Sequence, residues 1–325
     1  QGDYSVAVGQ NTLYNNTGGS NTAIGENALF ANTTGYNNTA IGRQALDANT
    51  DKSSHTAVGA SALSANTTGM INTAVGNAAL ALNTDGDNNV AMGYAALNAN
   101  TTADNNTGIG TQALEGNTTG GGNTAVGRGA MQANTTGVNN TAIGYGALDV
   151  NTTGASNVAI GVSALDANNA NSNTAVGNAS LGSNTTGTYN VALGQNAAST
   201  NTTGADIVAV GYGALQANTT ANSNTAVGTA SLNANTTGFN NVGIGRRALY
   251  VNTEGDANVA VGANALDSNT TADYNTAVGE GVLGANTTGE GNTAVGAYAL
   301  DANTTAANNT SLGFQSLTDN TIGAG

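Results

Sequence analysis

The sequence has no cysteine, proline or tryptophan, and few charged or aromatic residues. Among its 325 residues, charged side chains make up 7% and aromatic ones 4%. The lack of cysteine excludes disulfide bonds and thiolate metal sites. No run of about 18 apolar residues occurs, so no membrane span is predicted. These shortages exclude an ordinary mixed hydrophobic core.

Basic residues are also scarce: five against 19 acidic ones, for a net charge of −14. Nucleic-acid binding needs a basic stripe that displaces counterions from phosphates, and this chain has none. Docking to anionic lipid is disfavoured for the same reason. We therefore expect neither nucleic acid nor membrane insertion among its partners.

What the sequence has instead is glycine, at 47 positions, and a repeat. A pentapeptide of the type Asn-Thr-Ala-Val-Gly recurs nineteen times, and its final glycines, such as Gly25, Gly42 and Gly59, lie 17 residues apart. The spacing is 16 at Gly9–Gly25 and Gly161–Gly177. No linker interrupts the pattern, so residues 1–325 are predicted to be a single repeat array.

The 17-residue unit reads G-x-x-A-L-x-x-N-T-T-G-x-x-N-T-A-V. It is too short for the common helical repeats, which run from about 33 residues upward. Its Asn and Gly residues favour corners, because both tolerate left-handed backbone conformations. Two short extended pieces separated by corners predict an all-β fold, a parallel β-solenoid of 17-residue coils.

Side chains alternate along a strand, so the Thr and Val of N-T-A-V share one face and the Ala lies on the other. Valine replaces the Thr in seven copies, which suggests that this face and the leucine column line the coil interior. The Ala position never holds a residue larger than Ala or Ser, so we expect it to pack against sister chains. The predicted oligomer interface is Ala23, Ala40, Ala57, Ala74, Ala91, Ala125, Ala142, Ala159 and Ala175. The alternative is a flattened monomeric coil with the alanines inside.

An energetic estimate also favours association. Each coil has only two large aliphatic side chains, worth about 1.5–3 kcal/mol each when buried. Ordering the backbone costs about 1–2 kcal/mol per residue. Burial of a second face in an oligomer would offset part of that cost.

The pentapeptides Ser5-Val6-Ala7-Val8-Gly9 and Asn157-Val158-Ala159-Ile160-Gly161 resemble the head repeat of trimeric autotransporter adhesins. The longer form resembles repeats of phage tail-fibre-like and bacterial surface proteins. The resemblance covers the whole chain and implies a left-handed β-roll, assembled as a homotrimer, in an adhesive or spacer fibre on a cell or virion surface. End-to-end filaments, and carbohydrate or a host surface as partner, are further expectations. The unit is longer than in the adhesin heads.

The Asn of N-T-T begins an Asn-x-Thr sequon, which is a glycan acceptor in a secreted protein. The candidate glycosylation sites are Asn32, Asn66, Asn100, Asn117, Asn134, Asn151, Asn184, Asn201, Asn218, Asn235, Asn269, Asn286 and Asn303. Further sequons start at Asn15, Asn37, Asn105, Asn139 and Asn308. The alternative is a structural ladder of stacked Asn and Thr. Three copies keep the Asn and Thr but lose the sequon, which favours the ladder.

Catalytic chemistry requires residues that break the repeat. His55 is the one histidine and stands where other copies carry Asn, so we expect a surface variant rather than a metal ligand or base. Carboxylates such as Asp47 share their position with Asn98, which predicts an exposed site. The pair Asp85 and Asp87 lacks a calcium-loop spacing. We predict no enzyme, cofactor or metal site.

A soluble ice- or polysaccharide-binding solenoid is the alternative function. The regular Thr columns would suit ice. However, valine interrupts the strand column, and that column is expected to face inward, so an ice-binding role is disfavoured.

Overall fold

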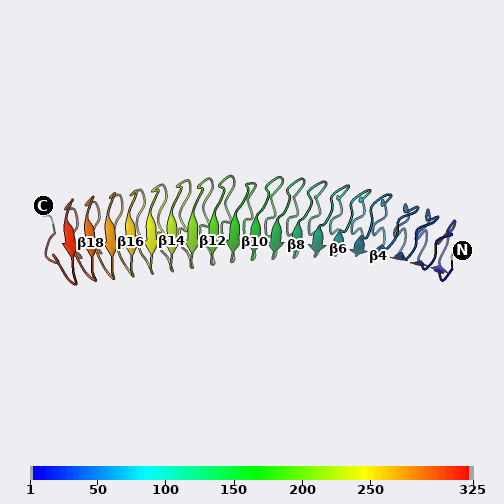
Figure 1. The fold of residues 1–325 in the computed structure, drawn as a ribbon, viewed down its shortest axis with the longest axis horizontal. Helices are drawn as coiled ribbons and strands as arrows, with labels where there is room; N and C mark the ends of the chain where they lie inside the picture. The colour runs from blue at the N-terminus through cyan, green and yellow to red at the C-terminus, as the bar shows by residue number, and fades with distance from the viewer. Residues whose placement is uncertain (1–2, 322–325) are drawn as a thin grey trace. The chain divides into compact units, whose positions relative to one another are not determined.

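The computed structural model describes residues 3–321 and has the predicted all-β architecture, a parallel β-solenoid without helices in that range. Each coil contributes one three-residue strand, followed by turns (Figure 1). No helix in the described range could cross a membrane. The chain divides into two compact units, residues 1–162 and 163–325.

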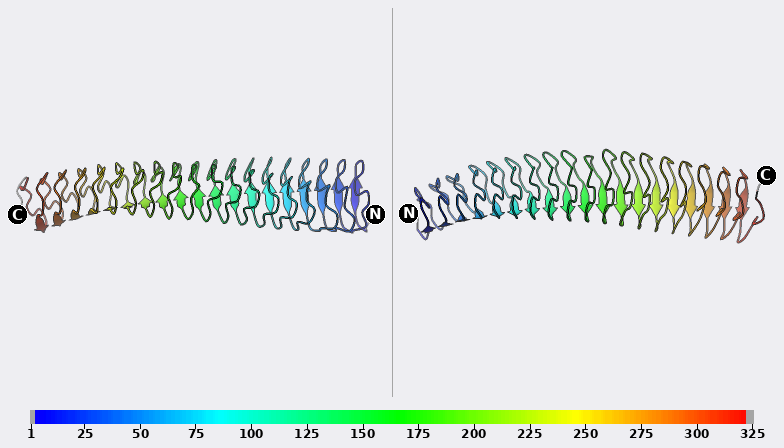
Figure 2. Two further views of the ribbon diagram at one scale, coloured as in Figure 1. Left: turned by 90° about the horizontal axis from the view of Figure 1, so that it is seen from above. Right: turned by 180° about the vertical axis from the view of Figure 1, so that it is seen from behind.

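The first unit contains ten strands, and each pairs in parallel with the strand of the next coil (Figure 2). Equivalent residues are partners throughout, as in Thr107 with Thr124 and Ile109 with Val126. The strands are β1 (Val6–Val8), β2 (Thr22–Ile24), β3 (Thr39–Ile41), β4 (Thr56–Val58), β5 (Thr73–Val75), β6 (Val90–Met92), β7 (Thr107–Ile109), β8 (Thr124–Val126), β9 (Thr141–Ile143) and β10 (Val158–Ile160).

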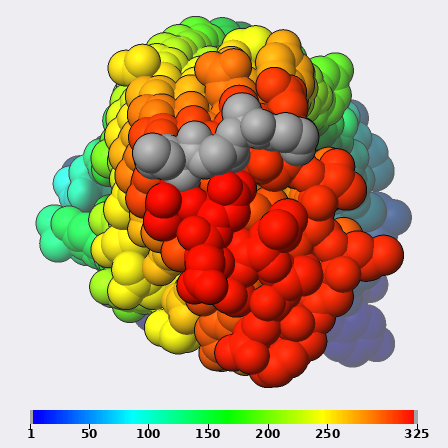
Figure 3. All heavy atoms as spheres, turned by 90° about the vertical axis from the view of Figure 1, so that its left-hand side faces the viewer, coloured from blue at the N-terminus to red at the C-terminus, as the bar shows by residue number. Residues whose placement is uncertain are grey.

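The second unit has nine strands with the same in-register parallel pairing. They are β11 (Thr174–Val176), β12 (Val191–Leu193), β13 (Val208–Val210), β14 (Thr225–Val227), β15 (Val242–Ile244), β16 (Val259–Val261), β17 (Thr276–Val278), β18 (Thr293–Val295) and β19 (Thr310–Leu312). Figure 3 looks onto the C-terminal end, where the visible atoms of the last coils pack together with no open channel.

Glycine ends every strand because two coils approach most closely there. Gly127 has a φ of +134°, and a Cβ on it would lie 2.5 Å from the carbonyl oxygen of Gly144 in the next coil. A side chain at this position would therefore meet neighbouring backbone as well as an unfavourable φ. The glycine that closes each pentapeptide is thus required by the stacking itself.

The turn after the strand places the leucine column inside the coil. Leu97 and Leu114 are fully buried, and their backbone φ angles are 50° and 54°. Large residues rarely adopt this left-handed conformation, which costs roughly 1–2 kcal/mol. Burial of the leucine side chain and the backbone hydrogen bond from Leu97 N–H to the Ala113 oxygen (2.9 Å) offset that cost.

The strand faces are opposite to the prediction. The middle residue of each strand, usually Ala, is buried, whereas the first and third residues lie on the outer surface. Ala125 is completely buried, while Ile109 keeps 37% of its surface exposed. The flattened coil with alanines inside, the alternative considered above, is the arrangement observed.

Candidate functional site

The alanines predicted to form an oligomer interface lie in the interior of their own chain. Ala23, Ala40, Ala57, Ala74, Ala91, Ala125, Ala142, Ala159 and Ala175 have no exposed surface. The position accepts only small residues because the leucine column lies beside it. At Gly108, which takes the place of alanine in β7, an added Cβ would lie 3.3 Å from Leu97 Cγ. The interface assignment is therefore wrong, since these residues contact their own coil.

The Asn residues of the Asn-Thr-Thr corners form a buried hydrogen-bonded column, the corner ladder. Asn117 Nδ2 donates to Asn100 Oδ1 (2.9 Å) and to the oxygen of Gly120 (2.9 Å). Asn117 Oδ1 in turn accepts from Asn134 Nδ2 (2.7 Å). The same pattern continues within the second unit, as between Asn235 and Asn218. Each buried amide is satisfied by its copy in the next coil, as buried polar groups require.

The corner ladder conflicts with the predicted glycosylation. A glycan replaces one hydrogen of Nδ2, but both of these hydrogens are used inside the coil. All thirteen candidates are fully buried, namely Asn32, Asn66, Asn100, Asn117, Asn134, Asn151, Asn184, Asn201, Asn218, Asn235, Asn269, Asn286 and Asn303. They are structural residues, and the prediction is corrected accordingly. Exposed sequons do occur, at Asn15, Asn37, Asn105, Asn139 and Asn308.

A second buried column, the strand-start ladder, consists of the Asn before each strand. Asn106 N–H donates to Asn89 Oδ1 (2.9 Å), and Asn106 Nδ2 donates to the Gly120 oxygen (2.9 Å). Asn123 N–H donates to Asn106 Oδ1 (2.9 Å). The strand-start ladder therefore joins consecutive coils just before the strands begin.

His55 occupies the strand-start ladder, so the prediction of a surface variant is wrong. Its side chain is 1% exposed. Asn72 N–H donates to His55 Nδ1 (3.2 Å), as it would to the Oδ1 of an asparagine. Asn66 Nδ2 lies 3.4 Å from His55 Nε2, and Asn49 Oδ1 is left without a partner. Burial lowers the pKa of His55 to about 4, only partly opposed by hydrogen bonding near Gly69 and Asn72 and by the charge of Asp87, so the ring is neutral at pH 7.

Carboxylates do not gather into a metal site in the described part of the chain, where no group of three His, Cys, Asp or Glu residues is suitably placed. Asp87 instead links coils, accepting from Met70 N–H (2.7 Å). Asp47, expected to be exposed, is partly covered, and burial raises its pKa. Asp149 and Asp267, at the same place in other coils, have pKa values raised by the same cause.

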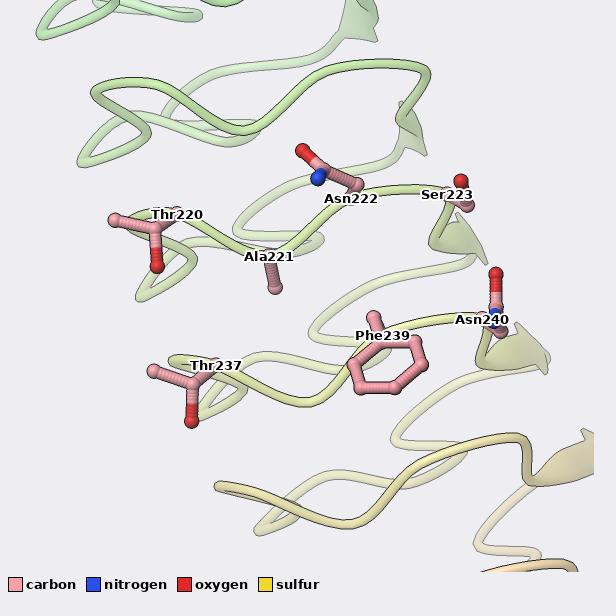
Figure 4. Close-up of a pocket in the computed structure, with 7 residues that line it drawn as sticks. All are labelled: Thr220, Ala221, Asn222, Ser223, Thr237, Phe239 and Asn240. Carbon is pink, nitrogen blue, oxygen red and sulfur yellow. The ribbon is translucent and has the colours of Figure 1, made fainter.

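A shallow pocket of about 310 Å³ lies beside Phe239 in the second unit. Figure 4 shows the ring of Phe239 and the side chain of Asn222 on adjacent coils, with Thr220 and Thr237 further along the same surface. Phe239 is 47% exposed. Other coils carry Asp87, Gly121 or Ala155 at the position of Phe239, so the pocket belongs to one coil and not to the repeat.

The surface that does recur is the outer strand face, defined here as the first and third residues of every strand. Its first column contains twelve Thr and seven Val, and its second column contains only Val, Ile, Leu and Met. No charged or aromatic residue interrupts it. In each unit this face is the repeated feature that a large ligand could contact.

The comparisons with known proteins identify no relative. No protein-family model matches the chain, and no curated protein matches it. The residues described above therefore provide the basis for a functional proposal.

Proposed function

We propose that the chain is a structural segment of an extracellular fibre, in which the stacked coils act as a spacer and carry adhesive contacts. The observation that carries this proposal is the self-sufficiency of the coil. Leucine, alanine and both asparagine ladders complete the interior of every coil with groups from the adjacent coils. A repeat built in this way extends by adding coils, which is what a spacer requires.

The resemblance to adhesin heads and tail-fibre repeats supports the extracellular location and the adhesive role. It also implies a homo-oligomer, with three chains preferred. The interior alanines cannot provide that contact, so any association must use an outer face. Light scattering tests this prediction, because a single chain has a mass of 31.5 kDa.

A non-catalytic role is part of the proposal. His55, the one imidazole in the sequence, is enclosed in the strand-start ladder with its pKa lowered by burial. It would have to leave the ladder in order to act as a base. The partly covered carboxylates recur in several coils as isolated groups.

Deletion of one complete coil tests the spacer role. Removal of residues 111–127 from the first unit joins two equivalent glycines, Gly110 and the residue after Gly127, and preserves the register. We expect a folded protein shorter by about 4.8 Å, the spacing of one strand. Beads coated with this variant should adhere to cells or polysaccharide nearly as well as beads coated with the full chain.

The control is a deletion of nine residues, 111–119, which breaks the register and should destroy stacking beyond the junction. If the full-coil deletion abolished adhesion while leaving the fold intact, a unique site in that coil would be responsible. The spacer proposal would then fail.

A further inference from the structure

The outer strand face combines two properties that seldom occur together on one surface of a protein this acidic. It has 38 positions in nineteen strands, and none of the 24 charged residues occupies any of them. The aliphatic column is substantially exposed, for example 39% at Ile143 and 43% at Met92. Contiguous apolar patches beyond a few hundred Å² usually indicate an interaction surface.

The threonines of this face differ from those at the corners in the state of their hydroxyl groups. Corner threonines donate to the next coil, as Thr118 Oγ1 does to the oxygen of Thr135 (3.0 Å). Among the described residues, the strand threonines, such as Thr107 and Thr124, make no side-chain hydrogen bond within the protein. Their hydroxyl groups remain available to a ligand outside the molecule.

The face is also a regular two-dimensional array within each unit. In-register pairing places Thr107 beside Thr124 and Ile109 beside Val126. The repeat is therefore about 4.8 Å along the stack and about 6.6 Å across a strand. Backbone hydrogen bonds and the buried ladders hold this spacing. A partner protein has no use for a uniform lattice of identical groups, whereas a crystal surface does.

Area and composition argue against the other occupants. Ten strands, each about 10 Å long, give a face on the order of 450 Å² in the first unit. A stable protein complex buries about 800 Å² per partner, and its energy is concentrated in aromatic and arginine anchors. The face has neither residue type. Crystalline polysaccharide is disfavoured as well, because sugar rings are bound by stacking on aromatic side chains.

We infer that the outer strand face is an ice-binding surface. Ice presents an uncharged lattice of hydrogen-bond donors and acceptors, which matches an uncharged lattice of free hydroxyl and methyl groups. Valine in place of threonine keeps the branched shape of the side chain, so the seven valines leave the array of methyl groups continuous. The inference goes beyond the proposed function and does not depend on it.

The structure removes the main objection raised from the sequence. The threonine column was expected to face inward, where it could not meet ice. It is instead outside, in contact with solvent along both units. The threonine at the centre of each pentapeptide thereby becomes a surface residue with an unused hydroxyl.

Thermal hysteresis and ice shaping by the full chain test the inference, with two matched triple variants. The face variant is Thr107→Lys, Thr124→Lys and Thr141→Lys. The control variant is Thr102→Lys, Thr119→Lys and Thr136→Lys, at exposed corner positions of neighbouring coils. Both variants add three positive charges by the same substitution. We expect loss of hysteresis in the face variant and wild-type hysteresis in the control.

Circular dichroism melting establishes that both variants are folded. If the lysine face variant is unstable, the same three threonines are changed to Tyr, which is favoured in strands and disrupts the array by its size. The inference is overturned if the wild-type chain shows no hysteresis at high concentration, or if face and control variants lose it equally. It is also overturned if the face variant changes only the oligomeric mass, because a second copy would then be the occupant.

Discussion

The replacement of His55 by Asn offers the sharpest test of the buried ladders, because it restores the residue that most other copies carry. In the native chain the imidazole is buried, and its pKa is lowered from 6.5 to about 4. The folded state therefore refuses a proton that the unfolded state accepts between these pH values. Stability is complete above pH 6.5, falls as the pH drops toward 4, and changes no further from this group below 4.

The size of the effect follows from the pKa difference. Each unit corresponds to 1.36 kcal/mol, so lowering from 6.5 to about 4 removes about 3 kcal/mol of stability from the coils around His55. His55→Asn has no such titration. It also provides an Oδ1 for Asn72 N–H and frees Asn66 Nδ2 to approach Asn49 Oδ1, which has no partner in the native chain. The variant should be more stable than the native chain at pH 4 and closer to it at pH 7.

Two measurements check this prediction. Nuclear magnetic resonance reports the pKa directly, because the chain has one histidine and hence one imidazole signal. Hydrogen exchange of Asn72 N–H, compared between the two proteins at pH 4 to 7, reports local opening, which suits a repeat array better than a global transition. Carboxylate titration is common to both proteins and cancels in the difference. A folded-state pKa near 6.5, or equal pH dependence in both proteins, would refute the reasoning.

Three other changes test different parts of the coil. Asn117→Ala breaks the corner ladder and orphans groups on Asn100 and Asn134, so it should cost about 2–4 kcal/mol in chemical denaturation, whereas Thr119→Ala on the exposed corner should cost little. Leu114→Ala leaves a cavity and should cost about 2–5 kcal/mol; a loss below 1 kcal/mol would mean that the coil collapses around it. Asp47→Asn should raise stability at pH 7, because burial raises the pKa of Asp47, and the gain should shrink on acidification; a gain independent of pH would contradict that cause.

Repetition made the fold class predictable. Seventeen residues between equivalent glycines, with Asn and Gly at the corners and Thr, Val and Ile in between, left a parallel solenoid as the consistent choice. The structure confirms it, with each strand paired to its equivalent in the next coil. The ladder alternative for the Asn-Thr-Thr corner also came from the sequence, through copies that keep Asn and Thr without the sequon.

The positions of the strand faces could not be decided in that way. Small-only occupancy at Ala125 and its equivalents indicates a close neighbour, but alternation does not say whether that neighbour is another chain or the same coil. The left-handed turn at Leu114 decides it, by directing the leucine inward against the alanine column. A leucine at positive φ has no signal in a sequence, because the residue type argues against that conformation.

The amino-acid sequence alone thus determined the period, the strands and the corners, since these depend on local backbone preferences repeated nineteen times. Tertiary structure decided which groups are inside. Asn117 and His55 are buried because the adjacent coils supply their hydrogen bonds, and the strand threonines are outside because leucine and alanine already fill the narrow interior. The surface that a ligand meets is therefore set by the stacking of coils, which no single repeat contains.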